Sequence, residues 1–474
     1  MTSTVDKSEL PPDKTDVNRQ LTALYISTFL LRIGFSSSLI LFDWVLVWGI
    51  EKKLGHAFAS DFRAIALTSF AAITFLIAEV MFTGYYGHKS DRNGVKPILT
   101  FATFGAAIVL VTYAPAPLIL ISFQGWTAVT LMVLYLALIH FLHGIVASGK
   151  VSPSLGFINY NSTDHNRALR MGIYDNAILY GRAVGMPLGG LLWYWMAVDE
   201  HGISVEEQGR RIAKTFPFLG IILVIAGILI VVGINNTPKH DEVHPFSLKE
   251  DITLAAKVML EEKRKPLLAP WLALAALIGS VSLWGPSIAF RSSEGEERSI
   301  IALIPIIVII LALALPAPYW GHLADTKGRK IVLNIGLLGL PLLGLGALIG
   351  FPFYKDNFSL SNPIFLFAIT PGIMLISGLV PVLMGALGDT ADKNVHDDGQ
   401  VMSGYHFIIA MGEIIGILIG GLVIGVFALL HKTIGLFETE QSALISGFLL
   451  FEFVLLVIVV IGIIKIPEQP EETE

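Results

Sequence analysis

Long apolar runs dominate this chain and limit what it can fold into. Each run is close to 20 residues, and the runs recur from residue 21 to residue 466. A helix needs about 20 residues to cross hydrocarbon, whereas a barrel strand needs only about 10 residues of alternating pattern. The mean hydropathy is +0.70, and charged residues make up 15% of the chain, against about 25% in soluble proteins. The sequence therefore predicts an all-α membrane protein.

The apolar runs divide the chain into twelve predicted membrane spans. Their ranges are 21–49, 64–87, 97–116, 127–148, 168–197, 214–234, 267–290, 299–321, 329–351, 363–388, 400–430 and 441–466. One long polar connection separates six spans from six, and residues 248–262 within it are expected to form an amphipathic helix on the membrane surface. The predicted domains are a tail (1–20), a six-helix bundle (21–234), a linker (235–266), a second six-helix bundle (267–466) and an acidic tail (467–474).

Positive charge is distributed unequally over the connections. The two termini and the even-numbered connections, one of which is expected to hold Lys150, carry 20 of the 32 Lys and Arg residues, and the odd-numbered connections carry 10. Cytoplasmic loops are the ones enriched in Lys and Arg, so both termini are predicted to be cytoplasmic. The first 20 residues contain neither a cleavable signal peptide nor visible organellar targeting, which favours a prokaryotic plasma membrane.

Several kinds of chemistry lack the residues they need. The chain contains no cysteine, which excludes disulfides and thiolate metal sites. It contains no phosphate-binding Gly-x-x-x-x-Gly-Lys-Ser/Thr loop and no basic face for nucleic acid. His140 and His143 have metal-like spacing, but no third ligand is nearby, so a hydrogen-bonded role between helices is preferred over a proton relay or a metal site. We expect no enzyme, no cofactor and no metal.

The two halves of the chain resemble each other. The loop at 87–96 matches the loop at 321–330 at an offset of 234 residues. The glycines of the fifth span match those of the eleventh at an offset of 231; the pairs are Gly181 with Gly412, Gly185 with Gly416, Gly189 with Gly420 and Gly190 with Gly421. Two matches at nearly one offset indicate a duplicated six-helix unit, which is common among secondary transporters.

Four charged residues fall in the middle third of predicted spans: Arg32, Glu79, Arg182 and Glu413. Each costs a few kcal/mol near the bilayer centre unless it is paired or hydrated, so each is a functional candidate. Arg182 and Glu413 also occupy equivalent positions of the repeat. A carboxylate at mid-membrane can bind and release a proton, which makes Glu413, and then Glu79, the preferred proton carriers. The alternative is a structural ion pair with Arg182 or Arg32.

The charge of a ligand stays open at this point. Arg32 with Arg182 would favour an anion, and Glu79 with Glu413 would favour a cation. Asp43 is placed at the outer mouth in preference to the centre, because the tryptophans beside it are typical of membrane interfaces. The other polar residues are expected in local roles: Asp175 solvated or capping, His406 hydrogen-bonded between helices, and Glu452 without an explanation.

The loops and glycines resemble the major facilitator superfamily of transporters. The loop residues that carry the resemblance are Gly87, Asp91, Arg92, Gly94 and Lys96, and in the second copy Gly321, Asp325, Gly328, Arg329 and Lys330. The first copy departs from the signature at Lys89 and Val95. The fifth span is similar to the superfamily's antiporter signature through Gly172, Gly181, Gly185, Gly189 and Gly190, with Pro187 shifted by one position. In the fourth span His140, His143 and Gly144 stand where many members have Arg-x-x-Gln-Gly.

This resemblance implies two pseudo-symmetric bundles around a central cavity and transport by alternating access. The loops would act as conformational latches, with Asp91 and Asp325 accepting backbone N–H groups at helix N-termini. The glycines of the fifth span would pack or bend against a neighbour. The expected cavity residues are Arg32, Asp43, Tyr135, His140, Trp284 and Ser377, together with Ser36 and Ser280. A break is expected at Trp284-Gly285-Pro286, and a kink in the eighth span at Pro305, Pro316 and Pro318.

The resulting functional prediction is a monomeric secondary transporter in a lipid bilayer. It is expected to move a small-molecule substrate coupled to an ion, with the proton preferred. Export by exchange is the first interpretation because of the glycine spacing in the fifth span. Uptake of an organic anion or a sugar by proton symport is the second. A non-transporting sensor or assembly factor is the alternative from another class, since fold alone does not fix function.

Overall fold

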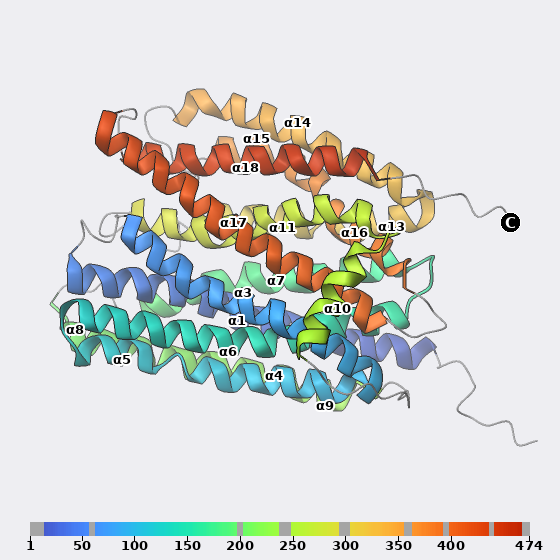
Figure 1. Cartoon of the computed structure of the whole chain (residues 1–474), viewed down its shortest axis with the longest axis horizontal. Coiled ribbons are helices and arrows are strands. Elements are labelled where there is room, and N and C mark those ends of the chain that lie inside the picture. Colours follow the sequence, from blue (N-terminus) through green and yellow to red (C-terminus); the bar gives the residue numbers. More distant parts are fainter. Residues whose placement is uncertain are drawn as a thin grey trace, which may run out of the picture.

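The computed structural model describes residues 14–55, 62–196, 202–236, 248–292, 304–354, 363–391, 398–435 and 440–466. Over these ranges all regular structure is helical, and most helices run along one long axis (Figure 1). The helices are α1 (Lys14–Leu54), α3 (Phe62–Asn93), α4 (Val95–Val111), α5 (Pro115–Ser122), α6 (Gly125–Tyr160), α7 (Arg167–Trp195), α8 (Val205–Ala213), α9 (Thr215–Gly233), α10 (Leu248–Leu260), α11 (Lys265–Ser292), α12 (Ile304–Ala314), α13 (Ala317–Lys327), α14 (Arg329–Tyr354), α15 (Pro363–Ile376), α16 (Leu379–Gly388), α17 (Asp398–Ile434) and α18 (Glu440–Ile464). Helix α1 begins and α18 ends at the same end of the molecule, on the right of Figure 1, which we call the terminal end.

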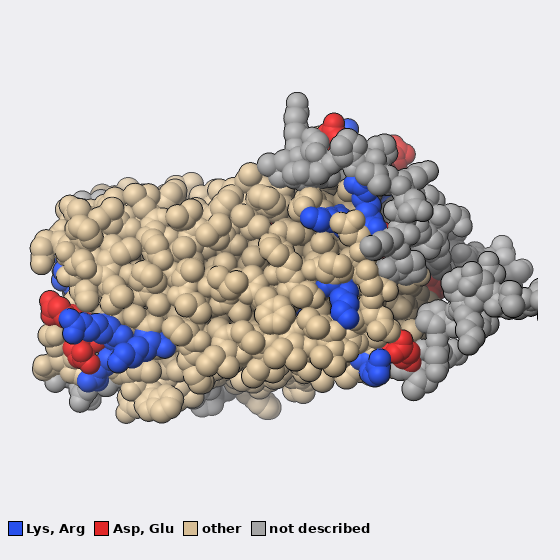
Figure 2. Space-filling view, turned by 90° about the horizontal axis from the view of Figure 1, so that it is seen from below, with Lys and Arg blue, Asp and Glu red and all other residues tan. Residues whose placement is uncertain are grey.

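The described helices have the properties of membrane spans. Nine helical stretches, counted over the described ranges, are long and apolar enough to cross a membrane, and four of these stretches each join two consecutive helices, such as α4 and α5. Lys265–Ser280 forms a shorter apolar helix. On the face shown in Figure 2, charged side chains gather toward two ends and leave a broad uncharged zone between them. The prediction of an all-α membrane protein is confirmed, while the count of twelve spans and the two-bundle boundaries stay predictions.

Helix α6 continues beyond its apolar run. The run ends at residue 148, but the helix ends at Tyr160. The expectation that Lys150 lies in a connection is therefore wrong: its side chain is inside α6 and is only 2% exposed. Hydropathy marks where lipid contact ends, whereas a helix persists for as long as its neighbours pack against it. Ser152 and Ser154, which lower the hydropathy of this stretch, are fully buried against other helices.

The proline predictions have different outcomes. Helix α11 is uninterrupted from Lys265 to Ser292, so the predicted break around Pro286 is wrong. A single proline removes one backbone hydrogen bond, and membrane helices tolerate that loss where neighbouring groups compensate. In the eighth span α12 ends at Ala314 and α13 begins at Ala317, so an interruption does occur at Pro316.

Helix α7 packs on α1 in the same way as α17 packs on α11. A Cβ atom on Gly181 would lie 2.6 Å from the carbonyl oxygen of Phe29. A Cβ atom on Gly412 would lie 2.6 Å from the carbonyl oxygen of Leu272. Small residues allow helix backbones to approach this closely in a membrane. The two glycines are partners in the sequence repeat, so the duplicated pattern corresponds to a duplicated contact.

Helices of the first half also touch helices of the second half. Helix α3 packs along α17, and α7 packs along α12 and α13. A Cβ atom on Gly87 would lie 2.5 Å from the carbonyl oxygen of Gly399, and one on Gly321 would lie 2.5 Å from that of Ala168. These two close approaches lie near the terminal end, at the two loops that the repeat identifies.

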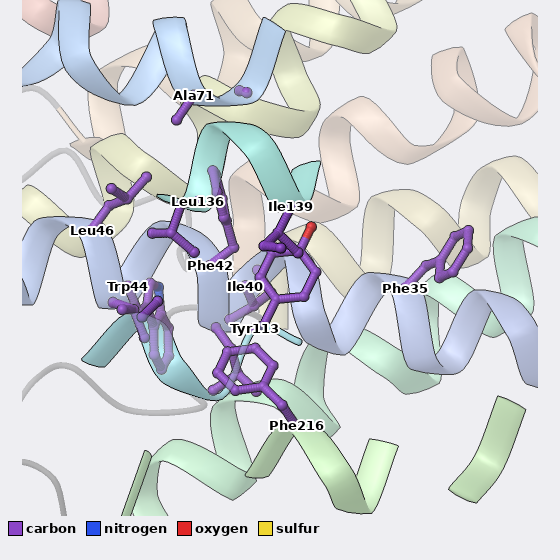
Figure 3. Close-up of a cluster of buried hydrophobic side chains, with 14 of the residues drawn as sticks. Phe35, Ile40, Phe42, Trp44, Leu46, Ala71, Tyr113, Leu136, Ile139 and Phe216 are labelled. Atoms are coloured by element: carbon purple, nitrogen blue, oxygen red, sulfur yellow. The ribbon is translucent and has the colours of Figure 1, made fainter. Parts of the chain in front are cut away.

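Buried apolar side chains fix the helices of the first half to one another. The largest cluster joins Phe42 of α1, Ala71 of α3, Leu136 of α6 and Phe216 of α9 (Figure 3). Aromatic side chains contribute much of its buried surface. This packing holds the middle of α1 in place, and Arg32 lies in that stretch.

We expect Gly185→Val to destabilise the bundle by about 1–3 kcal/mol, because inserted carbon atoms in a well-packed interface force backbone shifts. A Cβ atom there would lie 2.5 Å from the carbonyl oxygen of Ile33. The matched control is Val184→Leu on the exposed face of α7, where the side chain is 47% exposed. Thermal denaturation in detergent measures both variants. Equal stability of the two would contradict the close α1–α7 contact.

Candidate functional site

Two aspartates at the terminal end cap helices of the opposite half. The carboxylate of Asp91, at the end of α3, accepts hydrogen bonds from the backbone N–H groups of Gly399 (3.0 Å) and Gln400 (3.0 Å), at the start of α17. The carboxylate of Asp325, in α13, accepts from Ala168 (3.1 Å) and Leu169 (2.9 Å), at the start of α7. Each bond satisfies an N–H group that has no partner within its helix, next to the positive end of the helix dipole. The predicted capping by both aspartates is therefore present.

The glycines of these loops serve the turns between helices. Gly94 has a φ of 82° and Gly328 a φ of 98°, a region that side-chain-bearing residues rarely adopt.

Three basic residues of these loops have hydrogen-bond partners close by. Arg92 Nη1 lies 3.1 Å from His88 Nε2, the backbone N–H of Lys96 donates to Asn236, and Lys330 Nζ donates to the carbonyl oxygens of Ile463 and Ile466.

The two loop copies differ in their ion pairs. Arg329 Nε lies 2.5 Å from Asp389 Oδ2, and Arg167 at the start of α7 also pairs with Asp389. This arrangement joins the two halves through one carboxylate. In the first copy the position of Arg329 is taken by Val95, whose side chain is only 3% exposed. The departure at Val95 thus replaces an ion pair by an apolar contact. Sequence analysis missed Asp389 and Arg167, because their partners come from distant segments.

Four charged side chains lie near the middle of α1, α7 and α17. Arg182 is within electrostatic range of Arg32, Asp175 and Glu413, and Glu413 is within range of Arg32. None of the four forms an ion pair or a side-chain hydrogen bond with another described residue, and Arg32 Nε is buried without a partner. All four side chains are partly exposed although they face one another inside the bundle. Water-sized space must therefore reach them, as buried charges require.

Lys150 adds a cation that sequence analysis had assigned to a connection. Its Nζ donates a hydrogen bond to Ser27 Oγ of α1 at 3.1 Å, and it lies within electrostatic range of Arg32. One Ser hydroxyl uses only one of the three N–H donors of an ammonium group. We call Arg32, Glu79, Lys150, Asp175, Arg182 and Glu413 the central charge cluster.

Glu79 has a partner in the opposite half. Its Oε1 lies 3.2 Å from His406 Nε2 of α17. The other ring nitrogen of His406, Nδ1, lies 3.1 Å from Thr83 Oγ1 and 3.4 Å from Ser152 Oγ. Glu79, Thr83, Ser152 and His406 are all buried. The expected hydrogen-bonding role of His406 between helices is present, and it joins α3, α6 and α17.

The remaining predicted cavity residues are not part of this cluster. His140 stacks on Phe42 at 4.0 Å and its Nδ1 lies 3.2 Å from the carbonyl oxygen of Ala71, so it packs among the aromatic side chains of Figure 3. The Tyr135 hydroxyl donates to the carbonyl oxygen of Thr112, and the Ser377 hydroxyl donates to that of Met374. Asp43 is a buried residue of α1, and its place at the outer mouth stays a prediction. The Trp284 side chain lies outside the described residues.

Two further predicted residues have local partners. His143 Nδ1 lies 3.1 Å from the Tyr113 hydroxyl, inside the aromatic cluster. Glu452 of α18 accepts a hydrogen bond from Ser280 of α11, which accounts for a carboxylate that the sequence left unexplained. Over the described residues no group of three or more His, Asp or Glu side chains is arranged to hold a metal ion.

Comparison with known proteins identifies the class to which this arrangement of helices, loops and buried charges belongs. The model of the Major Facilitator Superfamily matches residues 24–338, well over half of the chain. The chain therefore belongs to this superfamily, whose members are membrane transporters of small solutes. No curated protein sequence matches it at a significant level.

Solved structures share the fold over nearly the whole chain. The human organic anion transporter MFSD10 (TETRAN) has a TM-score of 0.60 and 13% identity, covering 95% of this chain and 100% of its own. The proton:xylose symporter XylE, bound to 6-bromo-6-deoxy-D-glucose, has a TM-score of 0.63 and 13% identity, with 96% of both chains covered. At this identity the likeness concerns the fold alone.

The capping by Asp91 can be tested with a single-cysteine reporter, since the chain has no cysteine of its own. Ser403→Cys places a thiol in the α3–α17 contact, where Ser403 is fully buried. We expect Asp91→Ala to increase maleimide labelling of this thiol about fivefold, because a lost cap costs about 1 kcal/mol. The matched control is Glu207→Gln in α8, away from this contact. Equal labelling rates in all variants would contradict a closing role for Asp91.

Proposed function

We propose that the chain is a proton-coupled secondary active transporter that moves a small organic solute by alternating access. The observation that carries the proposal is the central charge cluster. It contains charged side chains without ion-pair partners, at mid-membrane depth, between the two repeated halves. Unpaired charges inside a membrane are costly and are retained where a ligand or an ion pathway needs them.

Glu413 is the best candidate for the proton carrier. It lies on α17 next to Gly279 of α11, and it faces Arg182 and Glu79 without an ion pair to either. A carboxylate in this position can take a proton when its cationic neighbour turns away and release it when water or a cation approaches. Glu79 is the weaker candidate, because His406 already holds it at 3.2 Å.

Alternating access requires contacts that open on one side of the membrane at a time. The caps formed by Asp91 and Asp325 cross between halves near the terminal end. We propose that these caps and the Arg329–Asp389–Arg167 ion pairs close that end, which the positive-inside rule assigns to the cytoplasm. On this proposal, 21–234 and 267–466 are the two moving bundles, and the linker 235–266 includes α10.

The direction of transport has two candidates. Export by exchange rests on the antiporter-like glycines of α7: Gly172, Gly181, Gly185, Gly189 and Gly190, with Pro187 among them. Gly412 and Gly416 of α17 make equally close contacts with α11, so this packing supports exchange only weakly. Uptake by proton symport is the second candidate, favoured by the additional buried cation Lys150. The names of the solved relatives, a symporter of xylose and an organic anion transporter, fit both a sugar and an anion as solute.

The decisive experiment measures proton flux in proteoliposomes with an internal pH dye, while lipophilic cations, organic anions, sugars and amino acids are added in turn. We expect one class to move protons in the wild type. In Glu413→Gln the flux should fall at least about tenfold, because the amide side chain does not bind and release a proton as a carboxylate does. The matched control is Glu452→Gln, a buried acid held by Ser280, which should retain the flux.

The other outcomes are equally informative. Solute counterflow without proton flux in the wild type would point to a uniporter or to another coupling ion. Equal proton flux in wild type and Glu413→Gln would make Glu413 a structural partner of Arg182. Neither proton flux nor counterflow with any class of solute would favour a non-transporting sensor or assembly factor and would contradict the proposal.

A further inference from the structure

We propose that the solute is a small organic monoanion, such as a monocarboxylate, bound among Arg32, Lys150 and Arg182 and carried together with one proton. This inference rests on the proposed transport function and specifies its substrate class and direction of coupling. It follows from the number, position and pairing of the charged groups in the centre of the bundle.

The three cations all come from the first half and surround one region. Arg32 is within electrostatic range of both Lys150 and Arg182. None of the three has an ion-pair partner among the described residues. Arg32 Nε has no hydrogen-bond partner, and Lys150 donates to a single neutral hydroxyl. Guanidinium and ammonium groups with free donors match the oxygens of carboxylates and phosphates.

The charged groups facing this region can be counted element by element. They are Arg32 of α1, Glu79 of α3, His143 and Lys150 of α6, Asp175 and Arg182 of α7, and His406 and Glu413 of α17. The sequences of α12, α15 and α16, and of α11 between Pro266 and Ser280, contain no charged residue. The region therefore holds the central charge cluster, which has two arginines, one lysine and three carboxylic acids, together with two histidines.

Both histidines have surroundings that a neutral ring can satisfy. His406 Nε2 lies 3.2 Å from Glu79 Oε1 and its Nδ1 lies 3.1 Å from Thr83 Oγ1, so a ring with one N–H group can use both contacts. His143 is buried between Phe35 and Phe75, with centroid distances of 4.2 and 5.3 Å, where a charged ring would lack solvation. In the state with Lys150 and both arginines charged, the three carboxylates ionised and both rings neutral, the positive and negative charges cancel.

This balance of charge decides in which states, empty or loaded, the carrier can turn its binding site from one side of the membrane to the other. In this charge state the empty cluster is neutral. One added proton makes it cationic, one added monoanion alone makes it anionic, and the two together restore neutrality. Closing a net charge into a low-dielectric interior costs several kcal/mol. Only the empty state and the state that holds both proton and anion therefore reorient easily, which is the requirement for symport.

The same balance disfavours exchange of a cation for a proton. Obligatory exchange requires that the empty carrier cannot return across the membrane. Here the empty cluster is neutral, whereas the state loaded with a monovalent cation and the state loaded with a proton are both charged. Such a carrier would return empty and uncouple the two fluxes.

A charge-selective chemical probe tests the inference without knowledge of the solute. Ile178 lies three residues from Asp175 and four from Arg182, on the same face of α7, and is partly exposed. In the Ile178→Cys variant, rates of modification by an anionic and a cationic methanethiosulfonate reagent are measured in detergent. Their ratio is independent of how much of the thiol is ionised, because both reagents react with the same thiolate.

We expect the anionic-to-cationic rate ratio to rise about tenfold from about pH 8 to about pH 5, as one carboxylate gains a proton. Adding Lys150→Gln should lower the ratio about tenfold at both pH values, since it removes one unit of positive charge. Adding Glu413→Gln should keep the ratio high at both. Lys327→Gln, which removes an exposed lysine of α13, is the matched control and should leave the ratio unchanged.

Three results would overturn the inference: a ratio that stays constant on acidification, a ratio insensitive to Lys150→Gln, or no reaction with either reagent, since water would then not reach the cluster. Proton flux driven by cations in the proteoliposome assay, together with a constant ratio, would leave the proposed transport intact and remove only the anion site. The expected ratios without flux of any solute would instead contradict the proposed transport, and with it the symport.

Discussion

A charge inside a membrane has to be compensated, and this constraint governs the arrangement of the whole bundle. Arg32, Arg182 and Glu413 lie in the middle of long apolar helices, where an uncompensated ion costs several kcal/mol. The helices meet this cost in two ways. Glu79 is paired directly, with His406 of the opposite half. The other charges share one partly exposed interior region without direct ion pairs. Close glycine contacts, such as that of Gly181 with α1, bring the helices near enough for the charges to balance one another.

Much of this arrangement could be predicted from the sequence, because duplication makes one half a guide to the other. The loop repeat identified Asp91 and Asp325 as helix caps, and the glycine repeat identified the contact surfaces of α7 and α17. The residues that were missed depend on contacts between distant segments. Lys150 was assigned to a connection because hydropathy cannot separate a polar loop from a buried polar helix turn. The partnership of Arg167 with Asp389 joins positions more than two hundred residues apart, and no local pattern contains it.

Packing has been kept in both halves of the duplicated unit, whereas charge has not. Gly181 and Gly412 make the same close contact, but the repeat partner of Arg182 is Glu413. All three cations of the cluster lie in the first half. The second half contributes one carboxylate and one histidine from α17 and no cation from the described parts of the helices around it. A ligand that bridges the halves would therefore meet donors on one side and a protonatable acceptor on the other, so its binding depends on how the halves are placed.

The terminal end is asymmetric in a related way. In the second loop copy Arg329 holds Asp389, and Asp389 also pairs across the interface with Arg167 of α7. In the first copy Val95 occupies the position of Arg329 and packs among apolar side chains. Separating an ion pair that crosses between the halves leaves charges unpaired in a poorly solvated place. The α3–α17 crossing has a different feature, because Glu79 of α3 and His406 of α17 bridge the halves close to the central charges. A change of charge in the centre therefore acts directly on this crossing.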